Sequence, residues 1–247
     1  MQELTLDKEK ISRNFSKSRY VYEENALVQR KMAQKLVSFL STPHTIVYDT
    51  ILEIGCGTGT LTKLVYAACT FNNYYAIDII AENKEFLTKE FPNLRYTCFD
   101  MDKIQNFCSE QYFDLIISNA AIQWSINPKQ LIINCIKRLT PNGTLALAFF
   151  GEKNFYEIKD IFGVGLTYLS LEQINEICKN YKIVHSSQEI HELSFPDTIS
   201  LLRHIKNTGV GSMSHSVIKK EQLKRYADKY RNKLTYNPVY LVLKKKG

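Results

Sequence analysis

A strand, a tight turn and the start of a helix follow one another in one short stretch of the chain. The apolar run at residues 45–54 ends on three glycines at alternate positions, Gly55, Gly57 and Gly59, and a helical pattern begins at the last of them. Glycine adopts backbone conformations that a side chain would obstruct, so such a loop lets the main chain close around a bound molecule. This arrangement constrains the fold more than any other feature, because it opens a βαβ unit.

Short apolar runs alternate with helical patterns in the first 150 residues. We predict strands at residues 45–54, 73–78, 94–99, 113–118 and 144–150. We predict helices between them at residues 59–69, 81–90 and 128–139. Strands separated by helices in this way are joined by right-handed crossovers, which predicts an α/β fold with a parallel sheet and helices on both of its faces.

The segments on either side of this alternation follow other patterns. The first 40 residues have helical periodicity from residue 3 onward and indicate two helices that meet near Tyr20 and Tyr22. After Gly151 we predict a helix at 169–179, a strand at 181–193, helices at 197–207 and 217–231, and a last strand at 234–243. Asp197 is placed to cap the helix that it begins.

Length and composition fit a single globular domain. The chain has 247 residues, 45% hydrophobic and 23% charged, and no apolar run approaches the roughly 20 residues that span a bilayer. Six scattered cysteines without a C-x-x-C pair predict reduced thiols rather than disulfides or metal ligands, and the first residues lack the apolar core of a signal peptide. We therefore expect a cytoplasmic protein that binds no metal.

We divide the predicted domain into four segments. They are an N-terminal helical cap (1–42), a ligand-binding core (43–194), an inserted helical segment (195–233), and a last strand with a basic tail (234–247). The formal net charge is +7, and residues 201–247 hold 12 lysines and arginines against two acids. This basic end is either a solvated surface or a face for an acidic partner, and composition leaves both open.

The glycine loop resembles the first motif of the class I S-adenosylmethionine-dependent methyltransferases. It reads Glu53-x-Gly55-x-Gly57-x-Gly59, so the third glycine comes one residue earlier than in the dinucleotide fingerprint, and an acid precedes the first glycine. A pyrophosphate favours helix N–H groups without a carboxylate nearby, whereas a sulfonium favours negative charge. The resemblance implies S-adenosylmethionine as cofactor, S-adenosylhomocysteine as product, and a Rossmann-like, seven-stranded, mostly parallel sheet with one antiparallel strand.

Polar residues at the ends of the next predicted strands fit the same cofactor. Asp78 is placed to accept hydrogen bonds from both ribose hydroxyls. The resemblance implies that Asp100 holds the adenine amino group, that Met101 packs on the ring, and that Asn119 lies beside the methionine moiety. We predict that the cofactor site consists of Tyr22, Gln29, Glu53, Gly55, Cys56, Gly57, Gly59, Asp78, Ile79, Asp100, Met101 and Asn119.

The residues after the fourth predicted strand narrow the choice of methyl acceptor. They read Ser118-Asn119-Ala120-Ala121, without the Asn/Asp-Pro-Pro-aromatic tetrad of enzymes that methylate the adenine amino group. The chain also lacks a Pro-Cys nucleophile at this point for pyrimidine rings and paired glutamates for arginine. These absences favour methylation of an oxygen that is already nucleophilic.

Four blocks along the chain resemble the malonyl-acyl-carrier-protein O-methyltransferases of biotin synthesis. They are Phe15 and Tyr22 followed by Gln29, the segment 113–124, the segment 202–209, and Leu234-Thr235-Tyr236. The resemblance runs nearly end to end. It implies transfer of a methyl group to the free carboxylate of malonyl-acyl carrier protein, giving a methyl ester that enters pimelate and biotin synthesis, with acyl carrier protein as the acidic partner.

The predicted reaction needs substrate-binding residues but no catalytic acid or base. A malonyl carboxylate is ionised at neutral pH, and in-line methyl transfer mainly requires alignment and a dry site. Arg203 and Lys206 lie three residues apart on one predicted helix, so both can point toward the carboxylate, the thioester or the carrier protein. We assign substrate binding to Arg203, Lys206, Tyr22, Gln123 and Trp124.

The inserted segment 195–233 is expected to form a lid over the reacting methyl group. In the implied fold the sixth strand is parallel and the seventh antiparallel, so their connection returns to the carboxyl edge, where the cofactor binds. Tyr20 and Tyr22 are expected to close the site from the N-terminal side. Two other functions stay open: a small-molecule or quinone-type O- or C-methyltransferase, and a less favoured RNA methyltransferase that binds phosphates with its basic end. No membrane partner is expected.

Overall fold

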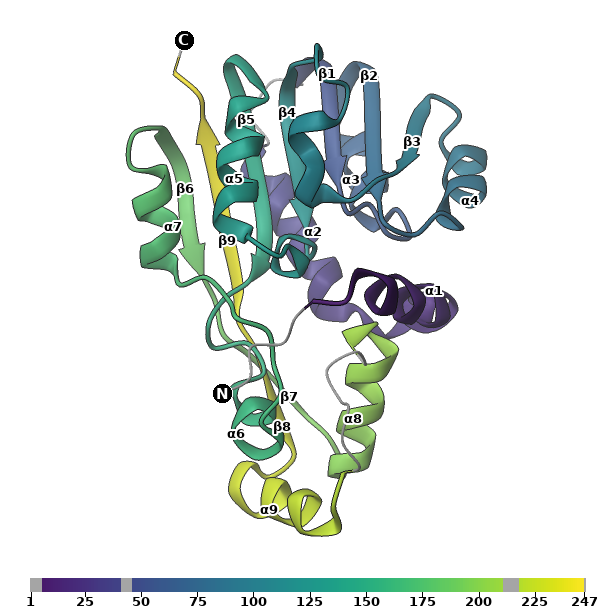
Figure 1. Ribbon diagram of the computed structural model, residues 1–247, viewed down its shortest axis with the longest axis vertical. Helices are drawn as coiled ribbons and strands as arrows, with labels where there is room; N and C mark the ends of the chain where they lie inside the picture. Colours follow the sequence, from purple (N-terminus) through teal and green to yellow (C-terminus); the bar gives the residue numbers. More distant parts are fainter. Residues whose placement is uncertain (1–5, 41–45, 211–217, 247) are drawn as a thin grey trace.

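The fold is built on one seven-stranded sheet, shown in Figure 1. The computed structural model describes residues 6–40, 46–210 and 218–246. The strand order is β3-β2-β1-β4-β5-β9-β6, and β9 runs antiparallel to both of its neighbours while the other pairs are parallel. This confirms the predicted sheet. The strands are β1 (Ile46–Ile54), β2 (Cys69–Asp78), β3 (Leu94–Cys98), β4 (Phe113–Asn119), β5 (Leu139–Phe150), β6 (Lys182–Gln188) and β9 (Pro238–Lys244).

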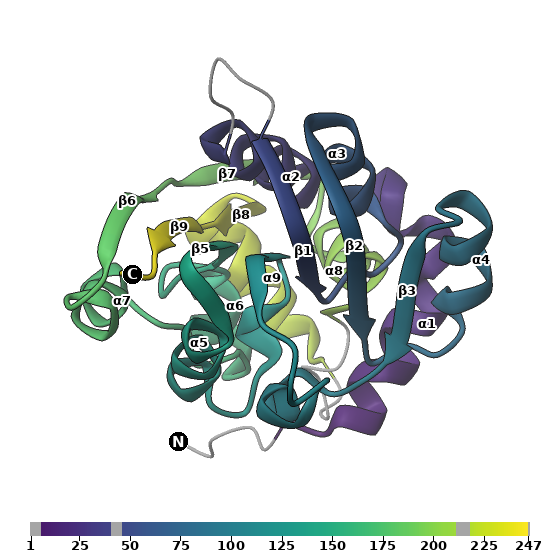
Figure 2. The same cartoon turned by 90° about the horizontal axis from the view of Figure 1, so that it is seen from above.

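Helices cover both faces of the sheet, as Figure 2 shows from above. One face carries α2 (Leu27–Leu40), α3 (Thr60–Ala68) and α4 (Asn83–Glu90), and the other carries α5 (Pro128–Lys137) and α7 (Leu171–Cys178). Side chains alternate along each strand, so the neighbours Ile51 and Leu52 belong to separate hydrophobic clusters, one on each face. Among the helices that the structure describes, none is long and apolar enough to cross a bilayer.

A further layer, of helices and a two-stranded ribbon, stands at the carboxyl edge of the parallel strands (Figure 1). It contains α1 (Lys8–Asn25), α6 (Tyr156–Phe162), α8 (Thr198–Asn207), α9 (Lys220–Tyr230) and a ribbon of β7 (His191–Ser194) with β8 (Lys233–Tyr236). In this layer α8 lies against both α1 and α9. Asp197 caps α8 as predicted, since its carboxylate accepts the backbone N–H of Ser200 at 2.7 Å.

The joint between the first two helices lies later than predicted. α1 continues through Tyr20 and Tyr22 and ends at Asn25, and the N–H of the following residue, Ala26, donates to the carbonyl of Tyr22 at 2.7 Å. The side-chain amide of Asn25 donates to the carbonyl of Val21 at 2.7 Å. Asparagine competes in this way for backbone groups near helix ends, and the two tyrosines do not.

Two predicted strands are each divided in the structure. The predicted strand 181–193 forms β6 and β7, and the predicted strand 234–243 forms β8 and β9. The breaks face each other, because the side chain of Asn237 donates to the carbonyl of Glu189 at 2.8 Å. The helix α6 was not predicted, since its seven residues are too few to establish a period. The predicted starts at residues 3, 45 and 217 lie outside the described residues.

Candidate active site

The loop between β1 and α3 requires glycine at its critical positions. Gly55, Gly57 and Gly59 have positive φ angles of 71°, 53° and 88°. A Cβ atom at Gly55 would lie 2.3 Å from Cβ of Ala121, and one at Gly59 would lie 2.7 Å from a methyl group of Leu87. The main chain therefore passes through this turn in a conformation and at a distance that side chains would prevent.

A cavity of about 450 Å³ lies between this loop and α1. Its volume is in the range of roughly 300–1,000 Å³ that small-molecule sites occupy. Most of the predicted site residues line it: Tyr22, Gln29, Gly55, Cys56, Gly57, Gly59, Asp78, Ile79, Asp100, Met101, Asn119 and Trp124. Among the predicted residues, Glu53, Gln123, Arg203 and Lys206 do not line this cavity.

One face of α1 forms a wall of the cavity, and most of this wall was missed by sequence reasoning. Lys8, Ile11, Phe15 and Arg19 line the cavity together with Tyr22. Their spacing of three or four residues places them along one side of a helix. The sequence therefore contained a signal that would have identified this face, but not what the face covers.

Asp78 at the end of β2 is buried and still able to accept hydrogen bonds. It is 8% exposed, and its carboxylate accepts the backbone N–H groups of Gly57 at 2.8 Å and Ile80 at 3.0 Å. Burial raises the pKa of Asp78, and the two backbone hydrogen bonds act in the opposite direction. Because an ionised carboxylate has about four acceptor positions, hydroxyl donors from a ligand would stabilise it further.

Glu53 lies beneath the loop rather than in the cavity wall. It is fully buried, and its Oε2 atom accepts the hydroxyls of Tyr74 at 2.6 Å and Thr62 at 2.7 Å, while Oε1 has no hydrogen-bond partner in the described part of the chain. Burial raises its pKa to about 7. Alternation along β1 places Glu53 on the same side as Ile51, toward α3, and this orientation could have been inferred from the strand period.

Two side-chain amides in the cavity wall have acceptor atoms without partners. The Nδ2 atom of Asn119 donates to the backbone carbonyl of Gln29 at 3.0 Å. The Oδ1 atom of Asn119 and the Oε1 atom of Gln29 are buried and accept no hydrogen bond from any residue that the structure describes. Buried polar atoms are rarely left unsatisfied, so these two acceptors fit a ligand that carries N–H donors, such as an ammonium group.

A second cavity of about 20 Å³ adjoins the first. Phe15, Tyr22, Gln29 and Trp124 line both cavities. Ala120 is also shared by the two cavities. The remaining residues that enclose the smaller cavity are Gln123, Phe150, Asn154, Phe155, Leu166, Tyr168, Thr208, Val210 and Tyr236. Burial, reinforced by the charge of Asp78, raises the pKa of Tyr22, which keeps its hydroxyl protonated as a hydrogen-bond donor.

Arg203 and Lys206 lie on the exposed side of α8. The buried positions of this helix are Thr198, Leu201 and Ile205, and the helical period directs the two cations away from that face. Neither cation lines either cavity. The hydrogen bonds from Ser200 lower the pKa of Asp197, and the nearby charge of Arg203 adds to this effect. Their assignment to substrate binding stays a prediction.

Among the described residues, α8 and the turn after it approach the larger cavity through contacts with α1. A Cβ atom at Gly209 would lie 2.3 Å from the ring of Phe15, and the side chains of Asn207 and Asn25 are 3.5 Å apart. Among the described residues, those that line the larger cavity include none from the 195–233 segment, whereas Thr208 and Val210 line the smaller one. Tyr20 is 81% exposed and lies under the guanidinium of Arg19.

Comparison with known proteins establishes the class. Residues 52–147, from β1 into β5, match the family described as Methyltransferase domain. A putative methyltransferase from Bacillus halodurans has the same fold, with a TM-score of 0.63 at 10% identity over 86% of this chain and 99% of its own. The N-methyltransferase NodS from Bradyrhizobium japonicum, solved with S-adenosyl-L-homocysteine, gives 0.53 at 14% identity over 88% and 87%. The protein is a class I S-adenosylmethionine-dependent methyltransferase.

The residues of the larger cavity fit this cofactor. The free acceptors of Gln29 and Asn119 suit its ammonium group, and Asp78 suits its ribose.

Similarity to proteins of assigned function extends over nearly the whole chain. A malonyl-acyl-carrier-protein O-methyltransferase from Calditerrivibrio nitroreducens is 33% identical over 94% of this chain and 95% of its own. The protein of that name from Chlorobium luteolum is 31% identical over 97% and 96%, and the one from Haemophilus influenzae is 29% identical over 96% and 95%. The chain belongs to the malonyl-acyl-carrier-protein O-methyltransferase family.

Proposed function

We propose that the protein transfers the methyl group of S-adenosylmethionine to the free carboxylate of malonyl-acyl carrier protein. The product is the malonyl methyl ester that enters pimelate and biotin synthesis. The observation that carries this proposal is the relationship to enzymes of this name over 94–97% of the chain, which includes the helices beyond the methyltransferase core. A similarity confined to the core would support a methyl donor but no particular acceptor.

The chain's own residues suffice for the proposed chemistry. The cofactor, when bound, supplies a methyl group on a positively charged sulfur. Asp78, Gln29 and Asn119 would hold its polar groups, and the glycine loop would let the main chain approach it closely. The malonyl carboxylate is already ionised and needs no base, and the protonated hydroxyl of Tyr22 can orient it by donation at the boundary of the two cavities. Phe15 and Trp124, whose ring centres are 5.3 Å apart, help to exclude water.

The basic helices α8 and α9 are proposed to receive the acidic carrier protein. On α9, Lys220, Lys224 and Arg225 are exposed and make no ion pair among the described residues, whereas Lys229 pairs with Asp160 at 2.9 Å. Arg203 on the neighbouring helix α8 is exposed as well. Their exposure supports steering of the carrier or its phosphopantetheine more than a buried clamp on the carboxylate, which would also lower the nucleophilicity of the oxygens.

A cytoplasmic location belongs to the same proposal. All six cysteines are free, and Cys56, Cys135 and Cys178 are buried. Free thiols in this number are typical of proteins from a reducing compartment.

Transfer of labelled methyl groups to a panel of acceptors tests the proposal. Malonyl-acyl carrier protein should be labelled in an alkali-labile ester, and acetyl-acyl carrier protein, which has no free carboxylate, should not. Malonyl-coenzyme A measures the contribution of the carrier protein, and bulk tRNA tests the RNA alternative. Labelling of tRNA without labelling of either malonyl thioester would overturn the proposal.

A further inference from the structure

We propose that Lys8 is a positioning residue of the cofactor site, which orients Asp100 toward the adenine ring and fastens α1 over the cavity. The inference rests on the proposed role of Asp100 in binding the adenine amino group. It concerns cofactor binding only and is independent of the methyl acceptor.

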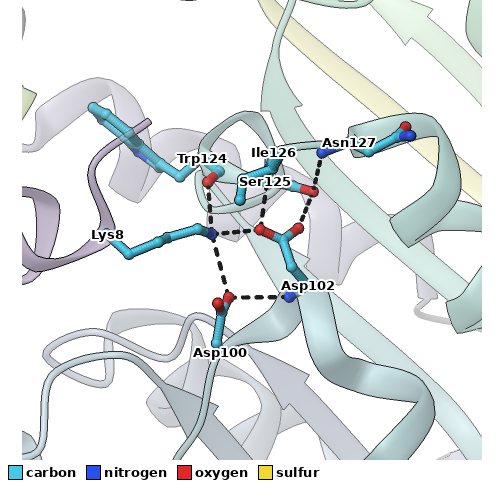
Figure 3. Close-up of polar contacts among 7 residues, drawn as sticks. All are labelled: Lys8, Asp100, Asp102, Trp124, Ser125, Ile126 and Asn127. Carbon is cyan, nitrogen blue, oxygen red and sulfur yellow. Dashed lines mark hydrogen bonds and ion pairs between the residues drawn. The ribbon is translucent and has the colours of Figure 1, made fainter. Parts of the chain in front are cut away.

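The ammonium group of Lys8 joins three segments that are far apart in the sequence (Figure 3). It lies 3.2 Å from Oδ1 of Asp100, 2.7 Å from Oδ2 of Asp102 and 3.1 Å from the backbone oxygen of Trp124. A lysine ammonium has three N–H donors, and each of them has an acceptor here. The contact thus connects the first residue of α1 with the loops that follow β3 and β4.

The acceptors of Lys8 are themselves held in place. Asp102 also accepts the hydroxyl of Ser125 and, at 3.1 Å, the backbone N–H of Ile126. The Ser125 hydroxyl in turn accepts the backbone N–H of Asn127 at 3.1 Å, next to the start of α5. Although burial alone raises the pKa of Asp102, the hydrogen bonds from Lys8 and Ser125 outweigh it and hold this pKa below its ordinary value. The carboxylate is therefore an ionised and fixed anchor.

Asp100 is left with one oxygen for a ligand. Its Oδ1 atom accepts both Lys8 and, at 3.1 Å, the backbone N–H of Asp102, whereas Oδ2 has no hydrogen-bond partner in the described structure. The residue lines the cavity, beside Met101. Fixing Oδ1 with two donors sets the rotation of the carboxylate, so Oδ2 is presented in a defined direction to an amino group in the cavity.

Two weaker contacts hold α1 farther along the same edge. The Ser12 hydroxyl donates to the carbonyl of Ile79 at 3.3 Å, and the Arg19 guanidinium donates to the carbonyl of Glu82 at 3.1 Å. Both acceptors are neutral, whereas Lys8 binds two carboxylates. Exposed ion pairs contribute little, but the side chains of Lys8, Asp100 and Asp102 are only 19%, 25% and 17% exposed, and hydrogen bonds between charged groups in such surroundings are strong.

The test compares two ligands that differ at the adenine amino group. S-adenosylhomocysteine carries this group, and S-inosylhomocysteine has an oxygen in its place. In the wild-type protein, calorimetry should give tighter binding of the adenosine compound. Lys8→Met should weaken binding of S-adenosylhomocysteine by about tenfold or more, because the charged contacts to Asp100 and Asp102 are lost. It should weaken binding of S-inosylhomocysteine less, so the ratio of the two affinities should fall.

Matched variants separate this role from general stability. Lys17→Met removes an exposed lysine of the same helix and should change neither affinity. Asp102→Asn keeps Lys8 but weakens its ion pair, so the ratio of the two affinities should lie between those of the wild-type protein and Lys8→Met. This variant also provides a test if Lys8→Met folds poorly. Equal weakening of both ligands, unchanged binding in Lys8→Met, or a wild-type protein that does not discriminate would each overturn the proposal. If the affinities are as expected but the protein does not methylate malonyl-acyl carrier protein, the proposed function is overturned and the role of Lys8 is not.

Discussion

Two regions with different construction are connected by α1: the loops at the carboxyl ends of β1 to β4, which line the larger cavity with it, and the helices α8 and α9, of which α8 packs on it. The loops present buried groups such as Asp78 and the glycine turn, held by backbone hydrogen bonds. The helices present exposed cations such as Arg203 and Lys224. A small cofactor is bound by a few desolvated contacts, whereas a protein partner is attracted by charge over a wide surface. Substitutions should therefore have large, salt-insensitive effects in the first region and small, salt-sensitive effects in the second.

The largest effect is expected at Gly55. In Gly55→Ala the new Cβ would lie 2.3 Å from Ala121 in a backbone with φ of +71°, so overpacking and strain act together. We expect the free energy of unfolding to fall by about 2–4 kcal/mol and binding of S-adenosylhomocysteine to be lost. Urea denaturation and calorimetry measure the two effects.

Gly57→Ala is the matched control for the turn. Gly57 also has a positive φ, of 53°, but apart from its two neighbours in the chain no described residue has an atom within 4 Å of its added Cβ, so only the strain of about 1–2 kcal/mol should remain. If the two substitutions destabilise the protein equally, the close contact with Ala121 is not the reason that position 55 requires glycine.

Glu53→Gln should stabilise the free protein at alkaline pH. The pKa of Glu53 is raised to about 7 from an ordinary value of 4.5, so between these two pH values the folded state holds a proton that the unfolded state has lost. The contribution of Glu53 to stability therefore decreases as pH rises from about 4.5 to 7 and stays low above it. Since one pKa unit corresponds to about 1.4 kcal/mol, the rise from 4.5 to about 7 costs roughly 3–4 kcal/mol above pH 7.

Urea denaturation from pH 5 to pH 8.5 measures this effect. The stabilities of Glu53→Gln and the parent should diverge as pH rises and approach each other near pH 5. The exposed Glu110, changed in Glu110→Gln, is the control and should follow the parent throughout. If the parent instead became more stable relative to Glu53→Gln as pH rises, the raised pKa of the buried Glu53 carboxylate would be contradicted.

Asp78→Ala should weaken S-adenosylhomocysteine binding by about 10- to 100-fold. The substitution removes the acceptors proposed for the ribose hydroxyls and the two hydrogen bonds that hold Gly57 and Ile80. Asp78→Asn keeps one acceptor oxygen and should lie between the two proteins in affinity. Calorimetry that gives unchanged affinity for Asp78→Ala would remove Asp78 from the cofactor site and erase the contrast between the two regions.

The sequence predicted best those features that topology alone brings together. Asp78, Asp100 and Asn119 each follow a strand, and parallel strands end at one edge, so their grouping required no knowledge of side-chain packing. Lys8 lies 92 residues from Asp100, in a segment rich in charged residues, and local pattern gives no reason to select it. Its role depends on how α1 lies across the edge, which is decided by tertiary contacts.

The orientation of the predicted cations is a different case. Arg203 and Lys206 share a side of one helix, which favours a common role, but the same period places Leu201 and Ile205 on the buried side. Applying the pattern to the apolar residues as well as to the cations would have predicted an exposed pair. Which partner an exposed pair contacts depends on the surface of the partner and is not encoded in the helix itself.

The smallest effect is expected for the exposed cations. Arg203→Ala should raise KM for malonyl-acyl carrier protein severalfold, about 1 kcal/mol, because it removes one charge from a surface that attracts an acidic partner. Affinity for S-adenosylhomocysteine should not change, and the effect should shrink at high salt because exposed charges are screened. Lys84→Ala removes an exposed cation on α4, away from α8 and α9, and should leave KM unchanged.

Malonyl-pantetheine, which lacks the protein part of the carrier, distinguishes the two roles proposed for Arg203. If the cation steers the carrier protein, Arg203→Ala should leave turnover of this small acceptor unchanged. If the cation instead clamps the carboxylate, both acceptors should lose turnover equally, and α8 would have to move so that Arg203 enters a cavity it does not line. A loss of cofactor affinity with unchanged KM would contradict both roles and place α8 with the cofactor region, which it adjoins through its contacts with α1.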